Sequence, residues 1–147
     1  MAVGFRLVKE GAANPVYKKL HIASQAYTLG DLSMLDTTAD AVDVVPATSS
    51  SVTANVYAVA METVASTATE ALFCLVTPDQ EWSVDCTNTP STNDNMQKMV
   101  LTDKATVNNT HSNSTSATAV FLQLGLTGAA SGKRIVGNIL RVPNVTA

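Results

Sequence analysis

Charged residues, aromatic residues and cysteines are all scarce in this sequence. Charged residues make up 14% of the 147 positions, aromatic residues 5%, and only two cysteines occur, Cys74 and Cys86. A globular chain of this length buries roughly 68–70% of its unfolded surface, so it needs neither a disulfide framework nor a structural metal to fold. Two cysteines and two distant histidines also lack the ligand spacing of a zinc site. We therefore expect no metal and no cofactor.

Long apolar segments are also missing. No run of 18 apolar residues exists, which argues against a transmembrane helix. The N-terminal sequence MAVGFRLVKEG interrupts its apolar stretch with charges and lacks a small-residue cleavage site, so it does not have the pattern of a secretory signal. We expect a protein that is synthesised and folded in the cytoplasm, without a membrane partner.

Basic residues are absent from the centre of the chain. Residues 20–97 contain ten acidic residues and neither lysine nor arginine, whereas residues 1–19 carry a net charge of +3 and residues 98–147 one of +4. Two basic ends and an acidic centre favour self-assembly or docking through complementary potentials; an uneven scatter of surface charge is the alternative. Nucleic-acid binding is not expected, because it calls for a domain-wide basic stripe with aromatic residues.

The chain is instead rich in β-branched and uncharged polar residues. It contains 18 valines, 19 threonines, 12 serines and 10 asparagines. Valine and threonine pack well on a pleated sheet, so the composition favours an all-β protein with a neutral surface. We predict a single small β-sandwich or barrel of about eight to ten short strands, with an N-terminal arm at residues 1–15, a β domain at residues 16–147 and long polar loops.

Strand-like segments separated by turn residues follow one another along the chain. Residues 5–9 and 16–22 flank the turn at 11–15 and are expected to form a first strand pair. Residues 134–142 carry apolar side chains on both faces, which indicates a central or covered strand. The other strand-like segments are residues 32–35, 42–45, 56–61, 71–76, 82–86, 99–102 and 117–126.

Residues 52–76 are open to two interpretations. Apolar residues between Val64 and Leu75 recur at helical spacing. The runs at 56–61 and 71–76 have strand composition, however, and the Ser/Thr-rich stretch between them would be a poor helix centre. We predict strand, loop and strand for this part of the chain.

The two cysteines also leave alternatives open. Cys74 lies within the apolar run LFCLV, where a buried thiol acting as a small hydrophobe is expected. A bridge between Cys74 and Cys86 is geometrically possible if their strands are neighbours. Disulfides are uncommon in a chain without an export signal, so free thiols are the expectation.

Side chains that would carry out catalysis do not form a recognisable constellation. Neither histidine has an acidic or cysteine partner near it in sequence, and His21 is expected to be an ordinary strand residue. We therefore do not expect an enzyme. The acids Asp79, Glu81 and Asp85 are expected to be solvated rather than to bind calcium. Trp82, which lies among them, is expected at a core or trimer interface, or as a platform that stacks on a sugar.

Three segments of the sequence together carry a resemblance to a known protein family. They are LVKEGAANPVYKKLHIASQAYTLGDLSMLD near the start, with its Gly30-Asp31 turn, NVYAVAMETV at 55–64, and AVFLQLGLTGAASGKRIVGNI at 119–139. Together they resemble small decoration (cement) proteins of tailed-bacteriophage capsids. The resemblance implies a β-rich structural protein without catalytic residues that attaches to an icosahedral head and joins neighbouring capsid subunits.

This resemblance sets the functional expectations. We expect a virion protein on the outer capsid surface, made in the host cytoplasm, with the major capsid protein and further copies of itself, as a homotrimer, as partners. An N-terminal arm would become ordered on binding. The expected capsid contacts in this part of the chain are Phe5, Arg6, Lys9, Lys18 and Lys19. The alternative is a carbohydrate-binding β-sandwich of a head fibre or tail-associated adhesin, which would use Trp82 and the polar loops at 87–97 and 103–116.

Overall fold

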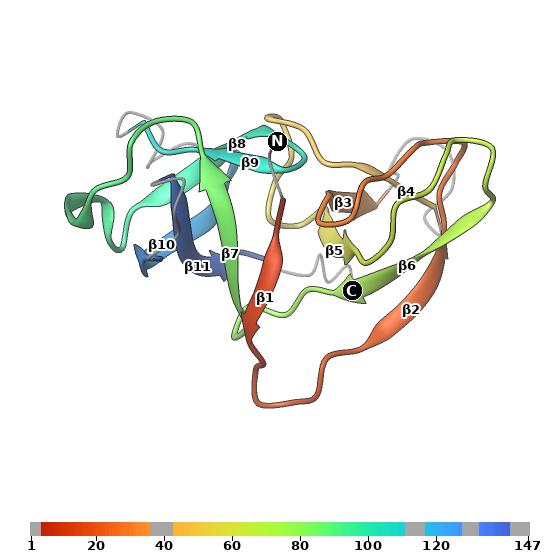
Figure 1. The fold of residues 1–147 in the computed structure, drawn as a ribbon, viewed down its shortest axis with the longest axis horizontal. Helices are drawn as coiled ribbons and strands as arrows, with labels where there is room; N and C mark the ends of the chain where they lie inside the picture. The colour runs from red at the N-terminus through yellow and green to blue at the C-terminus, as the bar shows by residue number, and fades with distance from the viewer. Residues whose placement is uncertain (1–3, 36–42, 111–116, 128–132, 142–147) are drawn as a thin grey trace.

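The computed structural model describes residues 4–35, 43–110, 117–127 and 133–141. Eleven strands and one short 3-10 turn make up the regular structure of these residues, so the predicted all-β class is confirmed. The strands form two sheets, of six and five strands, which lie beside each other along the long axis of the molecule (Figure 1). In the described part of the chain no helix is long and apolar enough to cross a membrane.

The six-stranded sheet has the order β1-β7-β11-β10-β8-β9. Its strands are β1 (Arg6–Lys9), β7 (Glu81–Cys86), β8 (Lys98–Asp103), β9 (Thr106–Asn108), β10 (Ala119–Leu126) and β11 (Arg134–Ile139). Neighbouring strands are antiparallel, except that the last two residues of β7 pair in parallel with β9. Because β7 pairs with β11 along one edge and with β1 and β9 along the other, the sheet closes into a small barrel.

The five-stranded sheet has the order β2-β6-β5-β3-β4 and is antiparallel throughout. Its strands are β2 (Tyr17–His21), β3 (Leu32–Leu35), β4 (Val44–Pro46), β5 (Val56–Ala60) and β6 (Glu70–Leu75). An isolated parallel bridge joins His21 to Asp43, the residue before β4. This sheet therefore also curls, with its two edge strands brought together at one end.

The main apolar core is shared by the two sheets. Side chains of β7, β8, β10 and β11 supply most of it, and alternation along β7 points Trp82, Val84 and Cys86 into it. The five-stranded sheet contributes residues such as Leu32 and Val59. Removing the apolar surface of these residues from water stabilises the fold by roughly 25 cal/mol per Å² buried. This burial is the main force that holds the two sheets together.

A second apolar cluster lies on the opposite face of the five-stranded sheet. Tyr27 and Phe73 form its centre, with ring centroids 5.0 Å apart in an edge-to-face arrangement. Leu20 of β2 and Val44 of β4 belong to the same cluster, so the curled sheet encloses it from both edges. Covering both faces explains why β5 and β6 are apolar on both sides, and why a helical spacing could be read into them.

Most predicted strands are confirmed, with ends shifted by a few residues. The segment at 52–76 forms strand, loop and strand, as β5 and β6. Residues 134–139 form β11, which lies between β7 and β10 and is central, as predicted. The predicted polar loop at 103–116 contains a further strand, β9, because Val107 points into the core and is fully buried.

The predicted pairing of residues 5–9 with 16–22 is wrong. β1 pairs with β7 in the six-stranded sheet, whereas β2 pairs with β6 in the other sheet. The turn at 11–15 therefore carries the chain from one sheet to the next (Figure 1). β1 and β2 each pair with a strand that is distant in sequence, and this pairing buries one face of each strand. A local hairpin between these two polar strands would bury neither face.

Residues 4–9, within the predicted N-terminal arm, do not form a free arm either. The Phe5 ring is 1% exposed and packs on Phe121, with centroids 6.0 Å apart, while the Phe5 N–H donates to the Gly30 carbonyl at 2.8 Å. Gly4 has φ +73°, and a Cβ at this position would lie 2.6 Å from the Gly30 oxygen, so only glycine fits. The Arg134 guanidinium donates to the Gly4 carbonyl at 2.8 Å.

Arg134 provides a test of this attachment. Its side chain is 11% exposed and also donates to Ser83 Oγ and Asp85 Oδ1, each at 3.1 Å. Arg134→Leu leaves these acceptors and the Gly4 carbonyl unpaired, so we expect a loss of about 2–3 kcal/mol of unfolding free energy. Urea denaturation measures the loss, and Lys133→Leu, at an exposed neighbouring position, should leave the midpoint nearly unchanged. Equal effects of the two variants would contradict the anchoring role.

Candidate functional site

The N-terminal rim is the surface on which most of the predicted contact residues lie. We define it as β1, β2 and the loop between them, residues 6–21, which runs along one edge of the molecule (Figure 1). Both strands end their sheets in the strand order. The cations exposed on the rim are Arg6, Lys9, Lys18 and Lys19. The structure therefore places all four predicted basic contacts on two consecutive strands, each at the edge of its own sheet.

A β-bulge in β1 sets the direction of its two cations. Arg6 pairs with Ser83 and Lys9 with Glu81, so one extra residue of β1, Val8, stands between two successive paired positions on β7. Arg6 and Lys9 consequently lie on the same outward face, although they are three residues apart. The Lys9 ammonium is 3.6 Å from the Glu81 carboxylate in an exposed ion pair, a type that contributes little to stability.

Exposed apolar side chains accompany these cations. Val8 is 57% exposed, and Val16 and Tyr17, at the start of β2, are each 53% exposed. Few other large hydrophobic side chains of the described residues are exposed to this extent. A surface that combines apolar side chains with cations is suited to contact with an acidic protein surface, since both area burial and complementary potential contribute.

The loop of the rim is anchored by Asp79 from the turn between β6 and β7. One carboxylate oxygen accepts a hydrogen bond from the Ala12 N–H at 2.7 Å, and the other accepts one from the Thr77 hydroxyl at 2.8 Å. These bonds, the Ala12 bond foremost, hold the pKa of Asp79 below its usual value. Gly11 permits this contact, because a Cβ there would lie 2.2 Å from the Asp79 oxygen.

Two predicted site residues lie elsewhere. Phe5 is buried in the core and offers no contact to a partner. Trp82 is fully buried as well, and its indole N–H donates to Gln80 Oε1 at 3.2 Å, so it cannot serve as an exposed sugar platform or trimer contact. The sequence left a core position among the alternatives for Trp82, and the period-2 alternation of β7 explains why it is taken: Trp82 lies on the inner face, whereas the acids beside it, Glu81 and Asp85, lie on the outer one.

The acidic residues near Trp82 have separate structural partners. Glu81 pairs with Lys9, Asp85 with Arg134, and Asp79 with the rim loop. Among the described residues no group of three metal-ligating side chains comes together.

His21 has a carboxylate partner that sequence proximity does not reveal. Its Nδ1 lies 2.6 Å from Asp43 Oδ1, at the point where β2 and the residue before β4 form their bridge. This contact fastens the two edges of the five-stranded sheet. It lies on the exposed surface and has a structural explanation.

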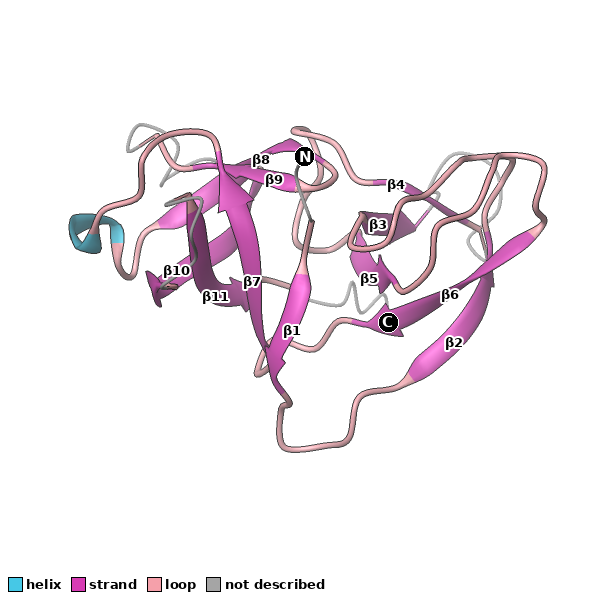
Figure 2. Cartoon of the chain, viewed as in Figure 1, coloured by secondary structure: helices cyan, strands magenta, loops and turns pink. Residues whose placement is uncertain are grey.

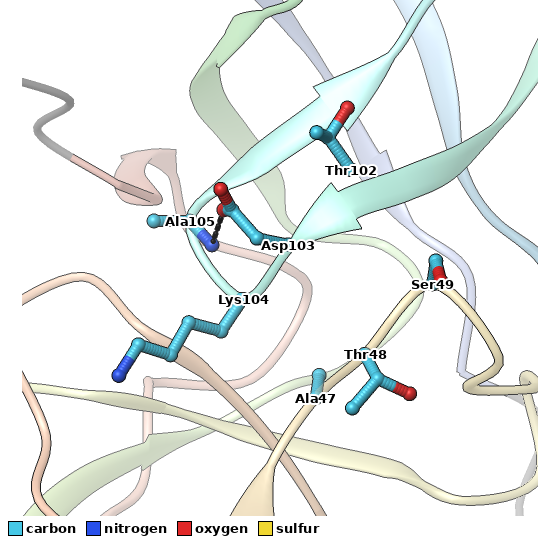
Figure 3. A pocket seen from close by; sticks show the side chains of 7 residues that line it. All are labelled: Ala47, Thr48, Ser49, Thr102, Asp103, Lys104 and Ala105. Carbon is cyan, nitrogen blue, oxygen red and sulfur yellow. Dashed lines mark hydrogen bonds between the residues drawn. The ribbon is translucent and has the colours of Figure 1, made fainter.

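A groove opens where the two sheets meet. Its volume is about 430 Å³, and its walls are the loop after β4 and the turn between β8 and β9 (Figure 3). The Lys104 ammonium extends away from Thr48 and Ser49 toward Asp31, with which it forms an ion pair at 3.2 Å, and Asp103 Oδ1 turns back to accept from the Ala105 N–H. The residues lining the groove are Ala47, Thr48, Ser49, Thr102, Asp103, Lys104 and Ala105. Its space is therefore bordered by methyl and hydroxyl groups rather than by charge.

Both cysteines are free and buried, so the bridge left open by the sequence is not formed. Cys86 Sγ lies 3.1 Å from the carbonyl oxygens of Asn88 and Lys133. Burial, followed by the nearby Asp85 charge, raises the pKa of Cys86 to about 11, and burial raises the pKa of Cys74. Raised values keep both thiols protonated and unreactive at neutral pH.

Comparison of the sequence with protein-family models found no match, and comparison with curated proteins found none either.

Sequence reasoning identified the cations of the rim but missed what fixes them. Asp79 lies 67 residues from Ala12, and Arg134 lies 130 residues from Gly4. The glycines at positions 4 and 11 are the available signals, since each permits a close approach of backbone to another group. No local pattern indicates which group approaches.

Asp79→Asn tests the anchoring of the rim loop. The pKa of Asp79 is lower in the folded state than its usual value. The ionised carboxylate therefore contributes fully to stability above the usual carboxyl pKa, and this contribution is lost as pH falls through the lowered value. We expect a lower protection factor for the Ala12 amide in the variant at neutral pH, and the same loss of protection in the wild type only in acid, each taken relative to the intrinsic exchange rate at that pH. Amide exchange measured by NMR resolves the site. Slow exchange at Ala12 in Asp79→Asn would contradict the anchor.

Cys86 provides a second pH test. Its folded-state pKa of about 11 exceeds the ordinary value of 9.0, so the contribution of the thiol to stability is complete below about pH 9 and is lost as pH rises toward 11. We expect the urea midpoint to fall over this range, and to fall less in Cys86→Ser. At pH 8 a thiol reagent should label neither cysteine in the folded protein and both after unfolding. Rapid labelling of the folded protein would contradict the buried assignment.

Proposed function

We propose that this chain is a structural decoration protein that binds the outer surface of an icosahedral phage head as a homotrimer and joins neighbouring major capsid subunits. The observation that supports it best is the N-terminal rim: four exposed cations and three exposed apolar side chains, carried on strands that are fixed to the fold before any partner arrives. Preorganisation lowers the entropy that binding costs.

The remaining surface suits the same role. Charged residues are few and threonine, serine and asparagine are many. Uncharged polar groups can be removed from water at a lower cost than charges, provided that they find hydrogen-bond partners. A trimer that contacts a head at three places adds modest single contacts into tight attachment. This mode of binding requires no pocket, nucleophile or cofactor.

The attachment of residues 4–12 to the fold changes how docking is expected to work. An arm that orders on binding would lose conformational entropy and bind with a large heat-capacity change. Residues 4–12 are already held by Arg134, Gly30 and Asp79. We therefore expect rigid-body docking of the rim, with little change in its backbone.

Charge reversal on the rim is the direct test. Lys19 is exposed on β2 and can be changed to glutamate without removing a buried group. We expect Lys19→Glu to bind empty phage heads several-fold more weakly than the wild type at low salt, and the difference to shrink near 1 M salt, where screening acts within about 3 Å. Co-sedimentation with heads measures the binding.

Lys133→Glu is the matched control, because it makes the same charge change at an exposed position away from the rim. Equal loss in both variants would indicate a general effect of net charge. Light scattering is needed alongside, since lysines on edge strands also prevent edge-to-edge aggregation. Wild-type protein that binds a glycan and no head would favour the carbohydrate-binding alternative.

A further inference from the structure

We draw no further inference here: the strongest candidate, the exposed Met96 side chain that follows the 3-10 turn η1 (Thr92–Asp94) at one end of the molecule (Figure 2), carries none because nothing in the described part of the chain shows what covers it.

Discussion

Attachment of the first described residues to the place where the two sheets meet is the constraint on which the rest of the structure depends. Phe5 contributes its ring to the shared core, and its N–H binds Gly30 in the loop that leads into β3. Arg134 fixes Gly4 to β7 and β11 at the same point. One short segment therefore connects both sheets, and β1 and β2 take their positions from it. The start of the rim is held in place because Phe5 is buried and because its N–H and the Gly4 carbonyl are both hydrogen-bonded.

A second connection between the sheets passes through the turn between β8 and β9. Lys104 accepts a hydrogen bond from the Leu32 N–H at 2.7 Å through its carbonyl and forms an ion pair with Asp31 through its ammonium. Asp31 is 3% exposed, so this pair is largely shielded from salt. These contacts account for the groove: the two sheets are fastened on one side of it, and the neutral loop after β4 forms the other side. The ammonium of Lys104, which borders the groove, is directed toward Asp31 and into the connection between the two sheets.

The positions of the few charged residues support the proposed role. Several are committed to internal contacts, such as Arg134 with Asp85 and Lys104 with Asp31, and the rim carries four of the exposed cations. A surface rich in hydroxyl groups, with a small number of fixed cations and apolar side chains, supports the proposed attachment through many contacts. Both cysteines, the obvious nucleophiles, are buried with raised pKa values.

The sequence by itself determined the class of the fold, most of its strands and the cations that are exposed. Valine and threonine content, alternation and turn residues are local properties, and they identified β5, β6 and the central β11. Partners of β1 and β2, the burial of Phe5 and Trp82, and the anchors Asp79 and Arg134 were decided only by the tertiary structure. The physical reason is that a strand exposes the same backbone groups to any neighbour, so its pairing is chosen by which distant surface buries its apolar face best. The sequence left Trp82 open between a core or interface position and a sugar-stacking platform. Adjacent residues of a strand point to opposite sides, so Trp82 can lie in the core while the acids beside it face outward.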